Sequence, residues 1–161
     1  MKKLNLIALL LMTLFTMSLT SCGDDNKEED VSPNTALLTA ATWSGDAIYI
    51  GQFPAALIIE KYAPDMADEL GALLDISDWK WKFERNGTFT ATMDGTTETG
   101  KWVFADNEKT LILTADDGEV QNFAVNSLTE TALNLEASVT DLGYDPEDVM
   151  GIDSFELRFK K

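Results

Sequence analysis

The sequence of 161 residues has no histidine, one cysteine and four prolines, and its 28 Asp and Glu outnumber its 12 Lys and Arg. Without histidine, the chain has no imidazole to act as a base or as a metal ligand. A single cysteine excludes an intrachain disulfide and a cysteine-cluster zinc or iron–sulfur site. The net charge of −16 argues against nucleic acid as a partner, because phosphate binding requires a basic surface. The length corresponds to one domain.

The first 22 residues have the pattern of a secretory signal. Lys2 and Lys3 precede an apolar stretch, residues 4–19, which is too short and too polar at its end for a transmembrane helix. It ends in Leu19-Thr20-Ser21-Cys22, which resembles a bacterial lipobox. The resemblance implies removal of residues 1–21 as a signal peptide and acylation of Cys22, whose acyl chains would anchor the protein to a membrane. The alternative is an ordinary signal peptide that happens to contain a cysteine.

Residues 22–36 follow as an acidic segment with five acids, one lysine and few apolar residues. Such a segment cannot pack, so we expect a disordered tether. An acidic run directly after a lipidated cysteine resembles the surface-export signal of lipoproteins in gut-dwelling Gram-negative anaerobes. Gly23 stands where the inner-membrane retention signal of enteric bacteria has Asp. We therefore expect the outer membrane of a Gram-negative envelope, with the cell surface as one option. The alternative for the acidic run is a solubilising linker.

The remaining residues, 37–161, are expected to form one mainly β domain. Apolar and polar residues alternate in eight candidate strands, and turn pairs such as Asn86-Gly87 and Asp94-Gly95 separate some of them. The candidate strands are residues 43–50, 79–84, 88–93, 97–104, 111–113, 120–125, 133–138 and 155–160. A spacing near ten residues with short turns predicts an antiparallel meander. Closure into a barrel, which removes both sheet edges, is favoured over a two-sheet sandwich.

The β pattern is interrupted between the first two strands, at residues 53–75. Pro54 can open a helix, and Pro64 ends it and suits the first turn of another. One apolar stripe follows at helical spacing, formed by Met66, Leu70, Leu73 and Leu74. These features predict a short helical hairpin whose stripe packs over one mouth of the barrel.

Several short motifs carry a family resemblance. They are Trp43 near the start of the first strand, the phrase Phe83-Glu84-Arg85-Asn86-Gly87-Thr88-Phe89, then Gly100-Lys101-Trp102 and Leu111-Ile112-Leu113. Together they resemble the small lipocalin-like (calycin-type) domains of bacterial lipoproteins that carry a helical insertion after strand one. The resemblance implies an eight-stranded antiparallel up-and-down barrel, which can enclose an apolar cavity.

The aromatic residues on the strands have two interpretations. An eight-stranded barrel is just wide enough to be filled by side chains or to hold one small ligand. If a cavity exists, we expect its lining to include Trp43, Tyr49, Trp81, Phe83, Phe89 and Trp102. The alternative is that the aromatic rings fill the barrel as a solid core.

The acidic loop at residues 140–153 raises the question of a calcium site, because Ca²⁺ prefers carboxylate oxygens. The spacing does not fit an EF-hand, since Leu142 stands where an oxygen ligand is required. Pro146 and the acids after it also suit the start of a short helix. We expect a helix or solvated loop, and no metal or cofactor.

Catalytic groups are scarce. Glu84, Glu136 and Glu156 fall on the polar phase of their strands, which predicts solvated carboxylates. The serines have no histidine partner and no Gly-x-Ser-x-Gly motif. We therefore expect a non-enzymatic protein and keep a carboxylate hydrolase as a minor hypothesis.

The sequence favours a membrane-anchored binder of a small apolar or amphipathic ligand. The alternative is an interaction or inhibitor module with a solid barrel core.

Overall fold

The computed structural model describes residues 31–141, 145, 147 and 151–161. The expected signal peptide, Cys22 and most of the expected tether lie outside these residues, as does much of the acidic loop. Ser32–Lys161 forms one compact unit. Its elements are α2 (Pro33–Leu38), β1 (Thr42–Ile50), β2 (Phe53–Pro54), α3 (Ala55–Tyr62), the 3-10 helix η1 (Pro64–Met66), α4 (Ala67–Leu74), β3 (Lys80–Phe83), β4 (Thr88–Met93), β5 (Thr96–Ala105), β6 (Thr110–Ala115), β7 (Val120–Leu128), β8 (Ala132–Ser138) and β9 (Ser154–Lys160).

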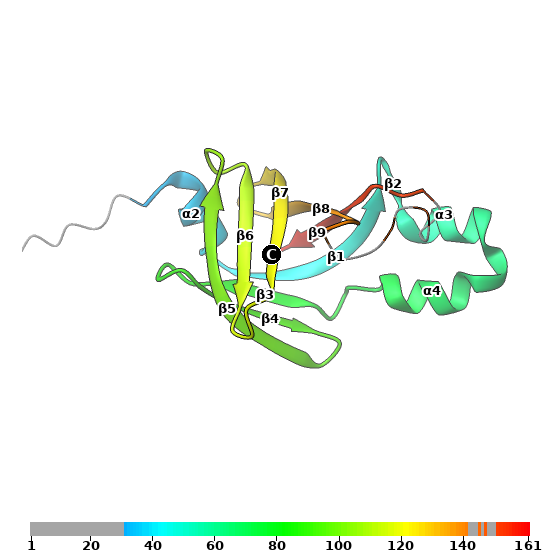
Figure 1. The fold of residues 1–161 in the computed structure, drawn as a ribbon, viewed down its shortest axis with the longest axis horizontal. Helices are drawn as coiled ribbons and strands as arrows, with labels where there is room; N and C mark the ends of the chain where they lie inside the picture. The colour runs from blue at the N-terminus through cyan, green and yellow to red at the C-terminus, as the bar shows by residue number, and fades with distance from the viewer. Residues whose placement is uncertain (1–30, 142–144, 146, 148–150) are drawn as a thin grey trace, which may run out of the picture. The chain divides into compact units, whose positions relative to one another are not determined.

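Eight antiparallel strands, β1 and β3 to β9, form the predicted closed barrel (Figure 1). Each barrel strand pairs with the next along the chain, and closure comes from β1, which pairs with both β3 and β9. Its first residues, Thr42–Ser44, pair with β3, and Ser44–Tyr49 pairs with β9. The β1–β9 pairing therefore leaves neither edge of the eight-stranded sheet open, as the even strand count predicts. The two-residue β2 pairs antiparallel with Tyr49 and Ile50 at the end of β1.

Helix α2 packs at one end of the barrel, opposite the end at which α3 and α4 lie (Figure 1). Ser32 caps it through its hydroxyl, which accepts a hydrogen bond from Thr35 N at 3.1 Å. Leu38 is fully buried in the barrel core. The indole Nε1 of Trp43 donates to Leu38 O at 2.9 Å. These contacts close this end of the barrel.

Because α2 begins at Pro33, the boundary predicted between tether and domain at residue 37 is wrong. Residues 33–36 are helical. The prediction relied on the polar composition of the segment. It missed the local cap at Ser32 and the apolar anchor at Leu38, which together favour a short helix.

The helical insertion lies where the sequence predicts it, between the first two barrel strands. Leu74, the last residue of the predicted apolar stripe, lies at the inner side of α4 and contributes to the wall of a cavity. The side chains of Met66, Leu70 and Leu73 lie outside the described part of the structure. Within the described residues, no helix is long and apolar enough to cross a membrane.

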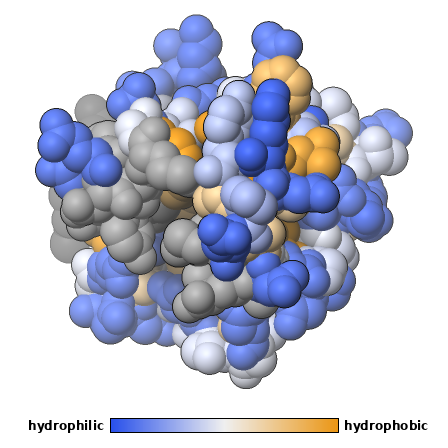
Figure 2. All heavy atoms as spheres, turned by 90° about the vertical axis from the view of Figure 1, so that its right-hand side faces the viewer, coloured by the Kyte–Doolittle hydropathy of each residue, from blue (hydrophilic) through white to orange (hydrophobic). Residues whose placement is uncertain are grey.

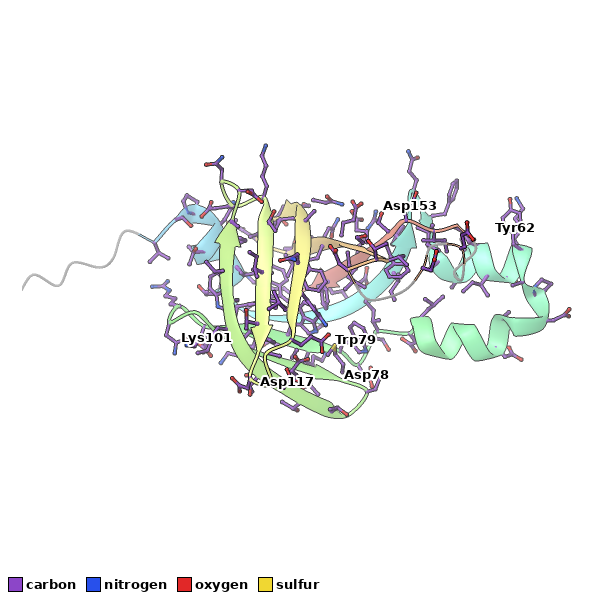
Figure 3. The ribbon with its side chains drawn as sticks, viewed as in Figure 1. Tyr62, Asp78, Trp79, Lys101, Asp117 and Asp153 are labelled. Atoms are coloured by element: carbon purple, nitrogen blue, oxygen red, sulfur yellow. The ribbon has the colours of Figure 1, made fainter. Side chains whose placement is uncertain are left out.

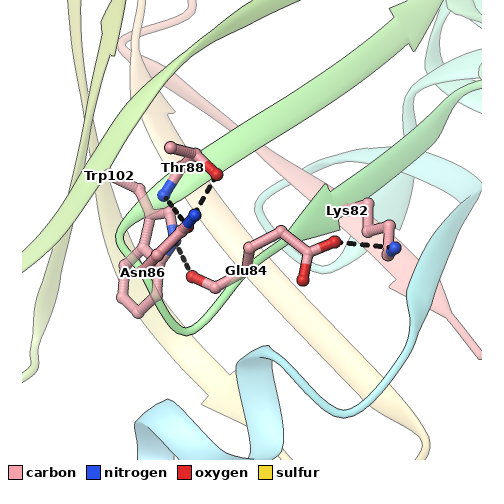
Figure 4. A network of polar contacts seen from close by, with 5 residues as sticks. All are labelled: Lys82, Glu84, Asn86, Thr88 and Trp102. Atoms are coloured by element: carbon pink, nitrogen blue, oxygen red, sulfur yellow. Dashed lines mark hydrogen bonds and ion pairs between the residues drawn. The ribbon is translucent and has the colours of Figure 1, made fainter.

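Two of the motifs that carry the family resemblance, residues 83–89 and 100–102, build the turn of the β3–β4 hairpin and its contact with β5 (Figure 4). Trp102 Nε1 donates to Glu84 O at 3.0 Å, and Trp102 N donates to Gly87 O at 2.8 Å. Asn86 Oδ1 accepts from Thr88 N at 3.0 Å and from Thr88 Oγ1 at 2.7 Å. These motif residues therefore hold the barrel wall together.

Candidate functional site

The end of the barrel beside α4 contains a cavity of about 230 Å³. Nine of its ten lining residues are apolar or aromatic, and the tenth is Gln121. They come from six strands, from α4 and from the segment before β3: Ile48, Leu74, Trp79, Trp81, Met93, Gln121, Phe123, Ala137, Phe155 and Leu157. The volume lies slightly below the usual range for drug-sized ligands. It exceeds the roughly 150 Å³ at which an apolar protein cavity binds benzene. The space suits a compact apolar body.

Trp81 lies between this cavity and the barrel core. Its side chain is 3 % exposed, and its ring packs against Phe159 and Phe123 with centroid distances of 4.8 and 5.7 Å. Its Nε1 is buried and has no hydrogen-bond partner among the described residues. An unpaired buried donor costs about 1–3 kcal/mol. Trp81 therefore packs through its ring, while its donor is left without an acceptor among the described residues.

A second, narrower space adjoins the cavity and shares Trp81, Met93 and Gln121 with it. Its volume is about 10 Å³, close to that of a single water-sized group. Glu98 and Glu119 border it on the polar side. Gln121 Nε2 donates to Glu119 Oε1 at 3.2 Å. The narrow space beside the apolar cavity is therefore bordered by two carboxylate side chains.

Glu98 lies on the inward phase of β5, with Gly100 and Trp102. Partial burial raises the pKa of its carboxyl, and the negative charges of Glu119 and Asp117 raise it further. Glu98 was not among the residues predicted from the sequence. The signal was its spacing of two and four residues from Gly100 and Trp102, which fixes its side chain on the same face of the strand.

Of the six residues predicted to line a cavity, Trp81 lines the one at the barrel mouth. Phe89 borders the narrower space beside it. Trp43, Phe83 and Trp102 point inward as predicted, but they are buried in the core and do not line the cavity. The strand phase of these five residues was predicted correctly, but alternation carries no information about depth along the barrel.

Tyr49, the sixth predicted residue, lies outside the barrel because β1 contains a bulge. The register with β9 shifts between Gly45 and Ala47, which reverses the inward phase of the strand. Ile48 therefore lines the cavity, and Arg158 lies over the Tyr49 ring with 3.4 Å between its Cζ and the centroid. The bulge also brings Gly45 against the backbone of Ile76, where a Cβ would overlap the Ile76 carbonyl oxygen.

Other cavity residues come from the wider aromatic set or from positions that the sequence did not single out. Trp79 is half-buried (Figure 3), and its Nε1 donates to Asp94 Oδ1 at 3.4 Å. Phe123 and Phe155 complete the aromatic part of the lining, and Met93 and Leu157 supply flexible and branched apolar surface. Their convergence depends on strand pairings that sequence spacing alone does not specify.

The carboxylates predicted on the polar strand phase lie on the outside of the barrel. Glu136 and Glu156 are directly paired across β8 and β9, and Asn126 Nδ2 donates to both, at 2.9 and 2.7 Å. The hydrogen bonds from Asn126 and then Ser154 lower the pKa of Glu136. Glu84 is exposed and forms an ion pair with Lys82 at 2.7 Å. The hydrogen bonds of Glu136 and Glu156 tie neighbouring strands together, whereas the Lys82–Glu84 pair joins residues at the end of β3.

The acidic loop at residues 140–153 was considered as a calcium site. Its residues 142–144, 146 and 148–150 lie outside the described residues. In the part of the chain that is described, no three acidic or cysteine side chains gather as metal ligands.

Comparison with known proteins agrees with this architecture. Residues 41–135 match the family of lipocalin-like domains. Because the match covers more than half of the sequence, the chain belongs to this family. No curated protein matches the chain. Among solved structures, the fold is similar to that of a DUF4847 family protein from Bacteroides vulgatus, with a TM-score of 0.51 and 15% identity over 76% of this chain and 93% of that one. At this identity the likeness shows the fold alone.

Proposed function

We propose that this lipocalin-like domain binds one compact, apolar or amphipathic molecule in the cavity at the barrel mouth. The observation that carries the proposal is the cavity of about 230 Å³ with its nearly all-apolar wall. Burial of apolar surface supplies the affinity, at about 25 cal/mol per Å² before the costs of association. Aromatic rings from β3, β7 and β9 give the wall a rigid shape. The proposal includes no catalytic step.

The proposal also includes a membrane anchor at Cys22, in the outer membrane of a Gram-negative envelope. The lipobox-like residues 19–22 and Gly23 support it. Either face of the outer membrane is compatible with the acidic tether. Metabolic labelling with a fatty acid should label the wild-type chain and not Cys22→Ala. Protease treatment of intact cells then distinguishes the cell surface from the periplasm. Labelling that persists in Cys22→Ala would refute the anchor.

Ligand binding is tested first on protein purified from its native membrane. Native mass spectrometry and organic extraction should recover a small molecule in a stoichiometric amount. The matched variants are Leu74→Trp, which adds a ring at the cavity wall, and Val103→Trp, which makes a similar change at a side chain 55% exposed. Loss of the molecule from the first variant alone supports the proposal. Equal recovery from both would contradict it.

A second candidate is an interaction module that docks a protein. The observation favouring it is a set of apolar side chains exposed on β2 and α3: Phe53, Leu57 and Tyr62, at 62, 57 and 69%. Figure 2 views the domain from the side of these elements and shows hydrophilic residues over most of the described surface, with apolar residues between them. A pull-down with Leu57→Glu and with Val103→Glu separates this candidate from ligand binding. A specific partner is lost only with the first variant.

A further inference from the structure

A further hollow lies between β1 and the helical insertion. This insertion groove has a volume of about 250 Å³. It receives carboxylates from Asp46 on β1 and from Asp75, which follows α4. Most of its remaining wall is apolar and consists of Ala47, Ile48, Pro54, Ala56 and Leu74. The insertion groove therefore offers apolar surface and negative charge in one place.

The two carboxylates of the insertion groove are accessible to a cation from outside. Hydrogen bonds from the side chain and then the backbone of Ser77 lower the pKa of Asp75, so its carboxyl is ionised at neutral pH. No described residue forms an ion pair with Asp75. Asp46 Oδ1 accepts from Lys160 Nζ at 2.6 Å, but this pair is exposed to solvent and contributes little stability. An incoming cation can therefore reach Asp75 and share Asp46.

Two exposed apolar side chains adjoin the insertion groove. Phe53 and Leu57 are 62 and 57% exposed. Their chain neighbours Pro54 and Ala56 line the groove. The two side chains and the groove thus form one docking face on β2 and the start of α3. Large apolar side chains exposed together beside a groove are typical of an interaction surface.

The charge of the helical insertion decides between possible occupants of the docking face. Lys61 is the one basic residue among residues 51–79. The exposed acids described in the same segment are Glu60, Asp65, Asp68, Asp75 and Asp78. A second copy of this chain would bring like charges together here, and an anionic membrane surface would be repelled. A basic partner is attracted, and the field steers it toward the face.

We propose that the docking face binds a basic polypeptide segment, whose apolar side chains cover Phe53 and Leu57 while one Lys or Arg side chain enters the insertion groove. The aliphatic stem of Lys or Arg packs on the apolar wall, and its cationic head reaches Asp75 and Asp46. This inference rests on the second candidate function, the interaction module, and names the chemistry of its partner. It is independent of ligand binding in the barrel cavity.

The test uses residues 22–161 with Cys22→Ser, which retain every residue that the structure describes. The probes are three labelled synthetic helices of about 14 residues that share one leucine stripe. Their polar face consists of lysine, glutamine or glutamate. Fluorescence anisotropy at pH 7.5 in 0.15 M NaCl measures their binding. We expect the lysine helix to bind at least about tenfold more tightly than the other two, because only its charge complements the face.

A pair of charge variants locates the electrostatic contact. Asp75→Asn removes the charge and keeps the oxygen that accepts from Ser77 N. It should weaken the lysine helix about two- to fivefold, the factor for an exposed ion pair. Asp106→Asn is the matched control, since Asp106 is exposed in the turn between β5 and β6, toward the α2 end (Figure 1). Screening over about 8 Å at this salt concentration should leave the control unchanged.

A pair of apolar variants locates the hydrophobic contact without a change in net charge. Leu57→Ser should weaken the lysine helix about fivefold or more, because it removes apolar surface that the partner covers. Val103→Ser is the matched control, since Val103 is 55% exposed on β5. Circular dichroism checks that all four variants keep the fold.

The outcomes separate this inference from the interaction module on which it rests. Weakening by Asp75→Asn and Leu57→Ser alone supports the inference. Equal weakening by the two controls refutes it, because the attraction would then belong to the whole acidic protein. If the glutamine or glutamate helix binds as tightly as the lysine helix and depends on Leu57, the module stands and the basic partner is refuted. If no helix binds and the pull-down recovers no partner that depends on Leu57, both fail.

Discussion

The closed end of the barrel gives the sharpest stability prediction, through Trp43→Phe. Trp43 is fully buried, and its Nε1 donates to the carbonyl of Leu38 at 2.9 Å. The substitution removes this bond and leaves the carbonyl buried without its partner, at a cost of about 1–3 kcal/mol. The smaller ring also leaves a gap larger than a methyl group, which adds about 1 kcal/mol. We expect a loss of about 2–4 kcal/mol in the free energy of unfolding.

Urea denaturation of residues 22–161 with Cys22→Ser, followed by circular dichroism, measures this loss as a shift in midpoint at constant slope. Trp79→Phe is the control, because it makes the same chemical change at a half-buried side chain with a long bond of 3.4 Å. We expect the control to lose less than about 1 kcal/mol. Equal losses in the two variants would refute the claim that α2 and Trp43 close the barrel through a specific buried contact.

Three further predictions concern the strands. Gly45→Ala should destabilise the fold by about 1–3 kcal/mol or more, because the added Cβ overlaps the Ile76 carbonyl; an unchanged thermal midpoint would contradict the close approach. Burial and neighbouring acids raise the Glu98 pKa above its ordinary value of 4.5. The stability tied to the protonated carboxyl is therefore lost as the pH rises through the raised pKa. Glu98→Gln should therefore be more stable than wild type at pH 7 and equal to it at pH 3, by urea midpoint. The Glu136 pKa is lowered, chiefly by Asn126, so Asn126→Ala should destabilise at pH 7, with the difference shrinking as pH falls through the lowered pKa; a pH-independent difference would refute this linkage.

Much of the fold was predictable because each strand carries its own signal. Alternation of apolar and polar residues identified all eight barrel strands, and the even count favoured closure, which β1 achieves by pairing with β3 and β9. The helical insertion was predicted from two prolines and an apolar stripe. The short helix at Pro33–Leu38 was missed, since its stability depends on one cap and one buried leucine.

The candidate site was less predictable, because it depends on relations between strands. Alternation assigned Trp43, Phe83 and Trp102 to the interior correctly, but it could not separate the packed core from the cavity at the mouth. Tyr49 was placed on the wrong face, because the bulge after Gly45 is defined by the pairing of β1 with β9.

The sequence by itself determined the eight barrel strands, their order, most of their inward faces and the place of the helical insertion, since periodicity and turn residues are local properties. Only the tertiary structure decided where the barrel is filled and where it is hollow. It also brought Glu98 and Glu119 to the space that Trp81 borders. These outcomes depend on register and bulges, which set depth and facing across strands far apart in the chain.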